Sequence, residues 1–404
     1  MSAQRQDERE LAPERTDEPA PTADARAAAP AKLQARRVER DMADRTRQDA
    51  LLYVQRLTKL YQVKRGLLGR AQLLHALNGV SFYVRRRETF GLVGESGSGK
   101  STRGRCLLRL TEPTLGRVVF DGRDITALGA AELRLMRQRM QIVFQDPYSS
   151  LNPSMTVGEI VREGIDVFDL AKTRAEAAER VVAQLERVGL RADMTRRYPH
   201  ELSGGQRQRV AIARALAVEP DFVVLDEPLS ALDLSVQAQI VNLLDELQQE
   251  LGLSLLLISH DLRAVQYLSH RLAVMYRGRI VEMGPTEAVA RRQHHPYTRA
   301  LFGAMPGRYW TGAAAGDAEP GADDDEERRG EAAPARRGAG LVPAETPSAL
   351  DAPLGCSFFS RCPRAEPGQC DVHAPDLLEI VPRSHHRTAC WHPHSEALGA
   401  SEDD

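Results

Sequence analysis

The stretch Gly94 to Thr102, GESGSGKST, decides the fold of this chain because it satisfies the pattern GxxxxGK[ST]. It follows an apolar run at residues 90–93 that predicts a buried strand, and it precedes a segment that can be helical. Glycines in such a loop let successive backbone N–H groups turn towards a phosphate, and the following helix adds the positive end of its dipole. The sequence therefore predicts a phosphate-binding loop within an α/β core.

Length and composition limit the class of protein. The chain has 404 residues and is 42% hydrophobic, which is enough for a sizeable core. Its 54 basic and 56 acidic residues nearly cancel, so we expect no nucleic-acid partner. The sequence contains neither the ~18-residue apolar run of a membrane span nor a signal-peptide pattern at its start. We expect a globular protein exposed to the cytoplasm.

Shifts in composition divide the chain into five parts. Residues 1–49 mix both signs of charge with Ala and Pro, which is typical of a disordered extension. Residues 50–310 carry the alternating strands and helices of the main domain. Residues 311–347 are rich in Ala, Gly and acidic side chains, as in a flexible linker. A small cysteine-containing domain at 348–394 and a tail at 395–404 complete the chain.

Hydrophobic periodicity predicts two kinds of sheet. Residues 51–61 and 77–84 alternate apolar with polar residues, and residues 116–125 have the pattern of a hairpin with its turn at Asp121 and Gly122, which indicates a small antiparallel subdomain. Buried strands alternating with helices predict a parallel sheet. The expected strands are 140–147, 222–227 and 253–259, the expected helices are 175–188, 206–218 and 236–251, and a last hairpin is expected at 273–284. A helical subdomain is expected over about 146–200.

A second glycine-rich string, LSGGQ at Leu202 to Gln206, also precedes a helix. Its paired glycines allow close backbone approach, its serine offers a hydroxyl, and the helix offers its dipole, so the chain has two devices that bind phosphate. Asp226 and Glu227 end the apolar run 222–227. There, one carboxylate can hold Mg²⁺ through water and the next can polarise a nucleophilic water.

Together these motifs resemble the ATP-binding subunit of an ABC transporter. GESGSGKST resembles the Walker A loop, LSGGQ the signature motif, and Asp226 with Glu227 the Walker B aspartate and the catalytic glutamate. Gln145 resembles the Q-loop glutamine and His260 the switch histidine. The resemblance implies a P-loop (RecA-like) core with an antiparallel β subdomain and a helical subdomain.

The resemblance also implies a set of site residues for ATP and Mg²⁺. SALD, Ser230 to Asp233, resembles the D-loop, and Tyr61 resembles the aromatic residue that stacks on adenine, with Tyr53 as the alternative. The implied contacts to ATP and Mg²⁺ are Tyr61, Gly94, Glu95, Ser96, Gly97, Ser98, Gly99, Lys100, Ser101, Thr102, Gln145 and Asp226, with Ser101 and Gln145 on the metal. The implied catalytic residues are Glu227, His260, Lys100 and Gln145, and the implied contacts to the nucleotide of a second subunit are Ser203, Gly204, Gly205, Gln206 and Asp233.

Longer segments resemble one subfamily, the ATPases of oligopeptide, dipeptide and nickel importers. These segments are QDPYSSLNPSMTVGEIV (145–161), YPHELSGGQRQR (198–209), HPYTRAL (295–301) and GCSFFSRCPRAEPGQC (355–370). The resemblance implies a peripheral protein on the cytoplasmic face of the inner membrane. Its implied partners are a second ATPase subunit, more often a sister chain than a copy, two membrane permeases, and indirectly an extracytoplasmic binding protein. Arg103 departs from the pattern, since relatives more often have Leu there.

Four cysteines gather near the end of the chain: Cys356, Cys362, Cys370 and Cys390. Their spacing lacks the CxxC pairs of zinc ribbons, although four thiolates can hold either zinc or an iron–sulfur cluster. Some peptide-importer ATPases that this chain resembles carry a [4Fe–4S] cluster in the matching segment. We therefore expect such a cluster, with Zn²⁺ and free or disulfide-paired thiols as the alternatives.

Some of these motifs also occur in proteins with functions other than peptide import. A P-loop kinase would share Gly94 to Ser101 but has no use for LSGGQ. A soluble ABC ATPase without a membrane partner, and an importer ATPase for nickel or another substrate, are the alternatives within the class. The intact catalytic positions Lys100, Glu227 and His260 argue against a non-catalytic regulatory cassette. The transported substrate is not encoded in these motifs.

Overall fold

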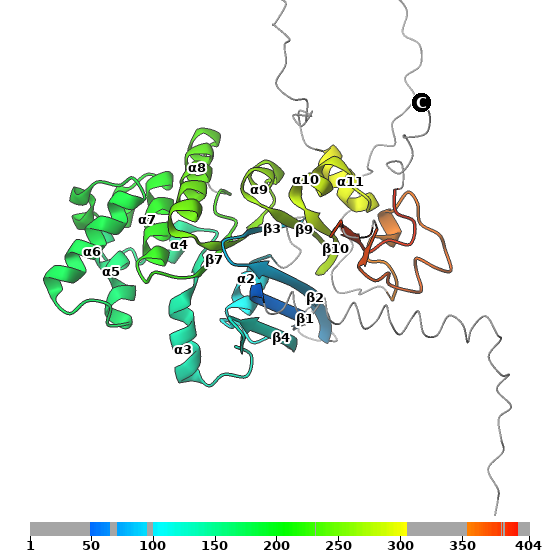
Figure 1. The fold of residues 1–404 in the computed structure, drawn as a ribbon, viewed down its shortest axis with the longest axis horizontal. Helices are drawn as coiled ribbons and strands as arrows, with labels where there is room; N and C mark the ends of the chain where they lie inside the picture. The colour runs from blue at the N-terminus through cyan, green and yellow to red at the C-terminus, as the bar shows by residue number, and fades with distance from the viewer. Residues whose placement is uncertain are drawn as a thin grey trace, which may run out of the picture. The chain divides into compact units, whose positions relative to one another are not determined.

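The computed structural model describes residues 49–64, 71–94, 100–230, 232–304, 354–380, 382 and 384–394, without the side chains of residues 63–64, 71–72 and 100–103. The expected disordered extension at 1–49, except Asp49, the linker at 311–347 and the tail at 395–404 lie outside the described residues. The described residues from Ala50 onward belong to one compact unit, and Figure 1 shows their arrangement.

A four-stranded antiparallel sheet forms one layer, in the order β2-β1-β4-β5. Its strands are β1 (Ala50–Lys64), β2 (Ala71–Arg85), β4 (Leu115–Phe120) and β5 (Arg123–Asp124). The turn between β4 and β5 is Asp121–Gly122, with φ angles of 48° and 77°. Positive φ at both central residues matches the right-handed twist of a hairpin, and Asp and Gly tolerate it. The expected turn is therefore confirmed.

The main sheet has eight strands in the order β11-β12-β10-β9-β3-β8-β7-β6. The strands are β3 (Thr89–Gly94), β6 (Met140–Val143), β7 (Phe222–Asp226), β8 (Ser254–Ser259), β9 (Arg271–Tyr276), β10 (Arg279–Pro285), β11 (Leu378–Glu379) and β12 (Arg387–Thr388). The five from β9 to β6 are parallel, and β10, β11 and β12 add antiparallel pairs at one edge. Every residue of β3, β7, β8 and β9 is buried, which explains their continuous apolar runs.

Helices cover the main sheet and form a group of their own beside it (Figure 1). They are α2 (Lys100–Leu107), α3 (Ala130–Arg139), α4 (Pro147–Ser150), α5 (Val157–Val167), α6 (Arg174–Arg187), α7 (Gly204–Leu216), α8 (Leu234–Leu251), α9 (Leu262–Leu268), α10 (Thr286–Arg291) and α11 (Pro296–Gly303), with short 3₁₀ turns at Ala192–Arg196, Pro199–Glu201 and Phe359–Arg361. Helix α5 lies within the expected helical region of about 146–200, although its own bounds were not predicted, and Thr156 and Glu159 form a capping box at its start. Together these elements confirm the expected α/β fold class. Within the described part of the chain, no helix combines the length and apolarity needed to cross a membrane.

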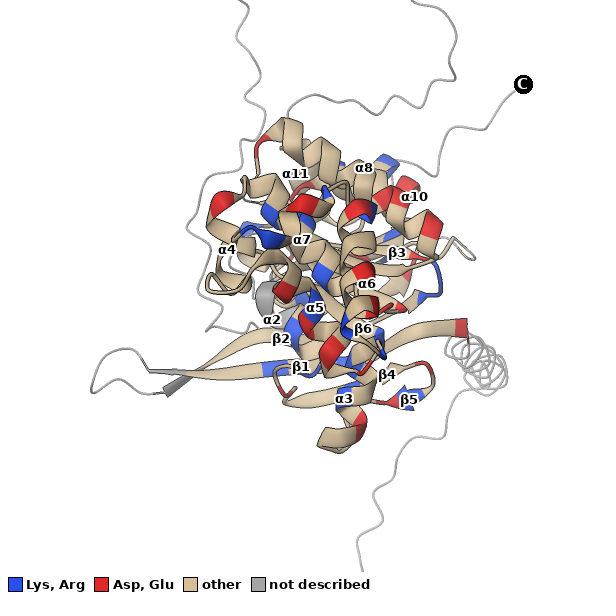
Figure 2. Ribbon diagram, turned by 90° about the vertical axis from the view of Figure 1, so that its left-hand side faces the viewer, with Lys and Arg blue, Asp and Glu red and all other residues tan. Residues whose placement is uncertain are grey.

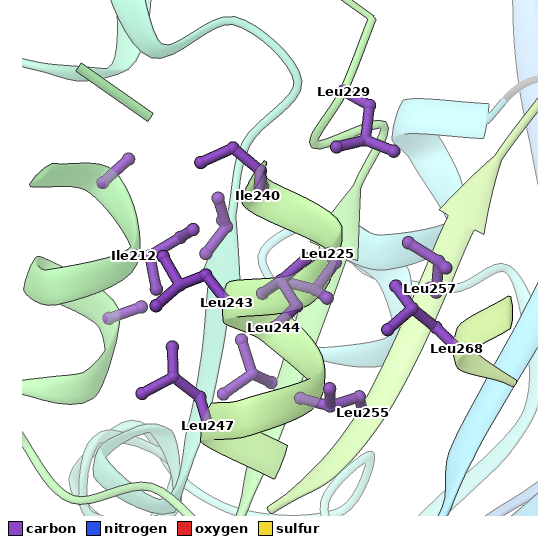
Figure 3. Close-up of a cluster of buried hydrophobic side chains, with 14 of the residues drawn as sticks. Ile212, Leu225, Leu229, Ile240, Leu243, Leu244, Leu247, Leu255, Leu257 and Leu268 are labelled. Atoms are coloured by element: carbon purple, nitrogen blue, oxygen red, sulfur yellow. The ribbon is translucent and has the colours of Figure 1, made fainter. Parts of the chain in front are cut away.

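One apolar cluster lies between α7, α8 and the strands β7 and β8 (Figure 3). Helix α8 contributes Ile240, Leu243, Leu244 and Leu247, a spacing that keeps one helical face towards the sheet. They pack in one buried cluster with Ile212, Leu225, Leu255 and Leu257. Burying one such side chain contributes about 1.5–3 kcal/mol, so this face holds α8 and α7 on the sheet.

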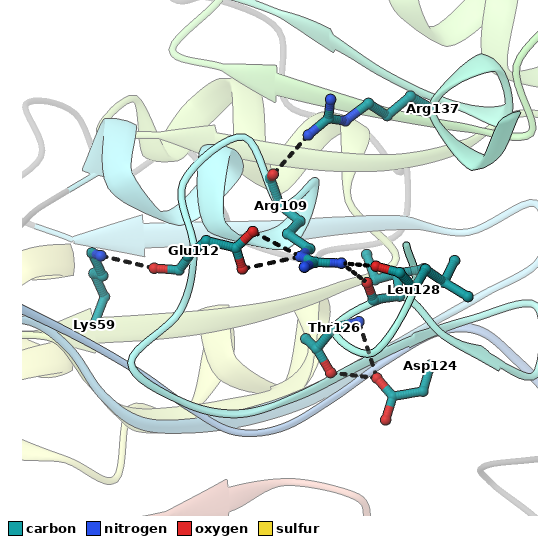
Figure 4. Close-up of polar contacts among 8 residues, drawn as sticks. Lys59, Arg109, Glu112, Asp124, Thr126, Leu128 and Arg137 are labelled. Atoms are coloured by element: carbon teal, nitrogen blue, oxygen red, sulfur yellow. Dashed lines mark hydrogen bonds and ion pairs between the residues drawn. The ribbon is translucent and has the colours of Figure 1, made fainter. Parts of the chain in front are cut away.

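A polar cluster ties the antiparallel sheet to the end of α2 (Figure 4). Arg109, two residues after α2, donates to both carboxylate oxygens of Glu112 at 2.9 and 3.0 Å and to the carbonyl oxygens of Ile125 and Leu128. Lys59 Nζ in β1 donates to the carbonyl oxygen of Glu112 at 2.7 Å. These bonds couple the sheet to the helix that begins at the phosphate loop.

Figure 2 shows that basic and acidic residues are interspersed along α5, α6 and α7. This mixture agrees with the net charge of −2 for the whole sequence.

Candidate nucleotide-binding site

The site lies where neighbouring parallel strands of the main sheet end. Residue pairs Val93↔Ser259 and Asp226↔Ile258 align the carboxyl ends of β3, β8 and β7. Ligands of open parallel sheets bind outside these strand ends, because the following loops and helix N-termini meet there. The structure therefore brings the end of β3, His260 after β8, and the acidic pair after β7 to one edge.

Glu227 is the centre of this edge. Its Oε2 accepts a hydrogen bond of 3.1 Å from the side-chain amide of Gln145 and lies 3.3 Å from Nδ1 of His260. The backbone N–H of Glu227 donates to the carbonyl oxygen of Ile258 at 2.8 Å. Only 5% of Glu227 is exposed, whereas the His260 side chain is 51% exposed. Two residues expected to act with Glu227, Gln145 and His260, thus converge on one of its carboxylate oxygens.

The backbone at Glu227 is strained. Its φ angle of 48° is in the left-handed region, which residues other than glycine, asparagine and aspartate seldom adopt. Strain of this kind costs about 1–3 kcal/mol and persists where the surrounding structure over-determines it, most often at functional sites. Asp226, the last residue of β7, is 2% exposed.

Gly94 ends β3 and begins the phosphate loop. A Cβ atom built on Gly94 would overlap the carbonyl oxygen of Met275 in the neighbouring strand β9, so this position has no room for a side chain. Helix α2 begins at Lys100, which gives the strand–loop–helix order that was expected. Glu95, Ser96, Gly97, Ser98 and Gly99 lie outside the described residues, as do the side chains of Lys100, Ser101 and Thr102.

The LSGGQ string starts helix α7. Ser203 is the N-cap residue: its hydroxyl accepts from the N–H of Gln206 and its own N–H donates to the Gln206 side chain at 3.0 Å. A Cβ on Gly205 would lie 2.5 Å from a methyl group of Val236, which excludes larger residues. Ser203 and Gly204 are exposed, so the positive end of α7 is open to a ligand carried by another molecule.

Asp233 and Tyr61 are the remaining expected contacts. Asp233 is exposed and is the N-cap residue of α8, without a side-chain capping bond. Tyr61 is half-buried in β1, and the ammonium group of Lys59 lies 5.0 Å from its ring centroid. The competing Tyr53 is also half-buried in β1, paired with Tyr83 and Val119.

Arg207 was not singled out in the sequence. It follows LSGGQ in α7, and its guanidinium group lies 5.2 Å from the Tyr148 ring centroid while Nε donates to the carbonyl oxygen of Pro199 at 2.7 Å. Tyr148 lies in α4, three residues after Gln145. Arg207 therefore joins helix α7, which begins at LSGGQ, to the loop that contains Gln145. No local pattern indicates this contact, because it crosses about sixty residues of sequence.

The four cysteines lie in the described C-terminal segment. The N–H of Cys356 donates to the carbonyl oxygen of Cys370 at 2.7 Å. Burial, with smaller contributions from the other three thiols, raises the pKa of the Cys390 thiol to about 12. Within the described residues, however, no group of three or more His, Cys, Asp or Glu side chains is arranged to hold a metal ion. The structure thus does not support the expected [4Fe–4S] cluster or the alternative Zn²⁺.

The fold and the strand-end geometry define a phosphate-loop ATPase. Comparison with known proteins gives the family. A family profile described as "ABC transporter" matches residues 77–230, and one described as "Oligopeptide/dipeptide transporter, C-terminal region" matches residues 281–320 and 331–370. The chain belongs to the ATP-binding subunits of ABC transporters, in the group that carries the oligopeptide/dipeptide transporter C-terminal region. As an ABC ATPase it uses ATP and Mg²⁺.

Relatives agree over most of the chain. A putative peptide import ATP-binding protein of Brucella ovis is 47% identical over 340 residues, which cover 84% of this chain and 97% of that protein. The oligopeptide transport ATP-binding protein OppF of Bacillus subtilis is 49% identical over 259 residues, 64% of this chain and 83% of that protein. Among solved structures, the dimeric, post-hydrolysis ATP-binding cassette MJ0796 bound to ADP and Pi matches with a TM-score of 0.53 and 31% identity, covering 58% of this chain and 98% of that one.

Proposed function

We propose that this chain powers a peptide importer by ATP-driven dimerisation of two nucleotide-binding subunits. The observation that carries the proposal is the convergence of Gln145 and His260 on Oε2 of Glu227, beside the strand that ends at Gly94. The peptide import names of the relatives in Brucella ovis and Bacillus subtilis favour peptides over nickel or another substrate.

In the proposed reaction, Glu227 orients and polarises the water that attacks the γ-phosphorus. The contacts from Gln145 and His260 to Oε2 hold the Glu227 carboxylate in position for this role. His260 and Lys100 would offset the charge that develops on the γ-phosphate. Mg²⁺ would be held by Ser101 and Gln145, with Asp226 acting through water, and would neutralise phosphate charge.

The second phosphate device serves a partner subunit in this proposal. Ser203 and Gly204 are exposed at the start of α7, and Gly205, Gln206 and Asp233 complete the contact set proposed for the partner's nucleotide. Two subunits would therefore sandwich each ATP, so that binding closes the dimer and hydrolysis reopens it. The solved structure of the ATP-binding cassette MJ0796, which is described as dimeric, has a similar fold.

The assembly proposed around this dimer has two permease subunits and receives substrate from an extracytoplasmic binding protein. The ATPase would lie on the cytoplasmic face of the membrane, with residues 50–310 as the nucleotide-binding domain and about 146–200 as the helical subdomain facing the permeases. We favour a sister ATPase over a second copy. The mass of the complex purified from its native host decides this, because a single ATPase species would exclude the sister chain. Purification without any permease would favour the soluble ABC ATPase instead.

Replacing Glu227 by Gln tests the catalytic proposal. The amide keeps the size of the side chain but lacks the negative charge that polarises water, so steady-state hydrolysis should fall at least about 100-fold while ATP still binds. Lys100→Ala should instead weaken ATP binding. The measurement is hydrolysis and ATP affinity in a complex whose other ATP sites are disabled. Unchanged turnover in Glu227→Gln would remove Glu227 from the mechanism.

We also propose that Cys356, Cys362, Cys370 and Cys390 hold a [4Fe–4S] cluster, with Zn²⁺ as the alternative. The hydrogen bond from the N–H of Cys356 to the carbonyl oxygen of Cys370 supports the proposal, because it brings two of the four cysteines side by side. The proposal requires the sulfurs to converge further than they do here, since the described residues include no metal-binding group. Anaerobically purified protein should contain about four iron and four sulfide per chain. Stoichiometric zinc, or no metal at all, would reject the cluster.

A further inference from the structure

The C-terminal segment, residues 354–394, extends the sheet that carries the phosphate loop. Strand β12 pairs with β10 through Glu282↔Thr388 and Met283↔Arg387, β10 pairs with β9, and β9 pairs with β3. Figure 1 shows the segment, in orange and red, beside β10 and α11. Three successive strand pairings therefore connect the segment to β3.

Phe358 is the main apolar anchor of this segment. It is 1% exposed, and its ring centroid lies 5.2 Å from that of Tyr276 and 5.5 Å from that of Tyr297. Tyr276 and Tyr297 are themselves 4.6 Å apart and almost fully buried. The three rings form an aromatic box between the end of β9, helix α11 and the C-terminal segment. Such edge-to-face and tilted ring pairs add to ordinary apolar burial.

The box touches the strand that packs directly on the phosphate loop. Tyr276 follows Met275, which is the register partner of Gly94. The Met275 carbonyl oxygen occupies the space that a side chain at Gly94 would need. Protein interiors are packed like crystals and transmit displacement rather than absorb it. A shift at the end of β9 therefore reaches the first residue of the phosphate loop.

A second anchor keeps the segment in register. Glu282 in β10 is fully buried, and its carboxylate accepts hydrogen bonds from the backbone N–H groups of His294 and His295 at 2.8 and 2.9 Å. Nε2 of His386, just before β12, lies 2.8 Å from the same carboxylate. His394 adds a reciprocal pair of contacts with His294. The segment is thus held at both ends against the nucleotide-binding domain.

From these contacts we infer that the C-terminal segment positions the phosphate loop, and that Phe358 is a positioning residue for MgATP binding. Phe358 acts through Tyr276 and Met275 on Gly94, without touching the nucleotide. This role rests on the proposed function of the loop after β3. It needs no metal in the cysteine segment, so it is independent of the cluster proposal.

The test compares MgATP affinity in purified full-length variants, measured by isothermal titration calorimetry well below their unfolding temperatures. Phe358→Ala should weaken MgATP binding about fivefold or more, the lower range of coupling between distant sites. Phe358→Leu keeps most of the apolar volume and should recover most of the affinity. In the assembled importer, Phe358→Ala should raise the KM for ATP while leaving kcat at saturating ATP within about twofold.

Leu185→Ala is the matched control, because Leu185 is fully buried in α6, which Figure 1 shows at the opposite end of the main sheet from the C-terminal segment. It should lower the unfolding temperature and leave MgATP affinity unchanged. Lys100→Ala in the same assay separates the proposed function of the phosphate loop from the positioning role of Phe358. If Lys100→Ala binds MgATP as tightly as the wild type does, the phosphate loop does not bind nucleotide as proposed. If Lys100→Ala loses binding while Phe358→Ala binds as the wild type does, the positioning role is wrong. Equal weakening by Leu185→Ala would also overturn it, because the effect would then follow from stability alone.

Discussion

The side-chain amide of Gln145 donates a 3.1 Å hydrogen bond to Oε2 of Glu227, across 82 residues of sequence. This bond joins the loop after β6 to the turn after β7, which are neighbouring strands of the main sheet. It therefore links the loop that leads into helix α4 with the carboxylate proposed to act on water.

The first prediction concerns this bond. Gln145→Ala removes the donor but leaves the Glu227 carboxylate in place, so we expect hydrolysis at saturating MgATP to fall about 10- to 100-fold. MgATP should also bind more weakly, because Gln145 is a proposed Mg²⁺ ligand. Gln145→Glu places a second carboxylate near Oε2, and like charges repel at this distance, so its activity should be lower still. ATPase assays of the assembled complex provide the measurement. Higher activity in Gln145→Glu than in Gln145→Ala would contradict the proposed arrangement.

The second prediction concerns the close approach of β3 and β9. Gly94→Ala would force the new methyl group against the Met275 carbonyl oxygen, so the phosphate loop should shift and ATP affinity should fall at least about tenfold. Gly303→Ala is the control, because nothing lies within 4 Å of the added methyl group in helix α11. It should bind ATP normally and gain up to about 1 kcal/mol of stability. Equal ATP affinities of the two variants would refute the steric argument.

The third prediction concerns stability in acid. Asp121 accepts a 2.7 Å hydrogen bond from Arg139 and pairs with Arg86, and the bond from Arg139 with the help of Arg86 lowers the pKa of Asp121 below its usual 3.8. Because the native pKa is depressed, this contribution is complete above about pH 4 and is lost as pH falls through the lower native value. Asp121→Asn should thus be less stable than wild type at pH 7, and the gap should close in strong acid.

Urea unfolding at pH 7, 5 and 3 measures this gap. Asn tolerates the φ of 48° at this turn position, so the substitution removes the charge without straining the backbone. A difference between wild type and Asp121→Asn that stays constant down to pH 3 would show that the ion pairs contribute nothing.

The fourth prediction concerns the buried carboxylate of Glu282. Glu282→Gln would turn an amide N–H₂ towards at least one of the N–H groups that now donate to the carboxylate, which should lower the free energy of unfolding by about 1–3 kcal/mol. Glu287→Gln is the control, because Glu287 and Arg291 form an exposed i,i+4 pair. That change should cost no more than about 0.5 kcal/mol.

Chemical denaturation of the full-length chain gives both values. The Glu282→Gln variant should also exchange the backbone amides of Thr388 and Ala389 faster, since Ala389 donates to the carbonyl oxygen of Val281 beside Glu282. Similar unfolding free energies for the two variants would show that the Glu282 contacts are not a significant anchor.

The sequence by itself determined the elements whose causes are local. Three elements depend only on residues that are close together in the sequence. They are the order of strand, loop and helix around Gly94, the turn at Asp121 and Gly122, and the helix after LSGGQ. Hydrophobic runs likewise predicted the parallel strands β7 and β8. Family membership followed from motifs of this kind and is confirmed by the comparisons.

Only the tertiary structure decided which distant residues meet. The convergence of Gln145 and His260 on one oxygen of Glu227 depends on strand order, and so does the contact of Met275 with Gly94. The antiparallel edge formed by β12 on β10 was not expected from the sequence, nor was the left-handed backbone at Glu227. The physical reason is that strand pairing and packing join segments up to about 180 residues apart, as Gly94 and Met275 are. The free energy of these contacts belongs to the assembled core and not to any local pattern.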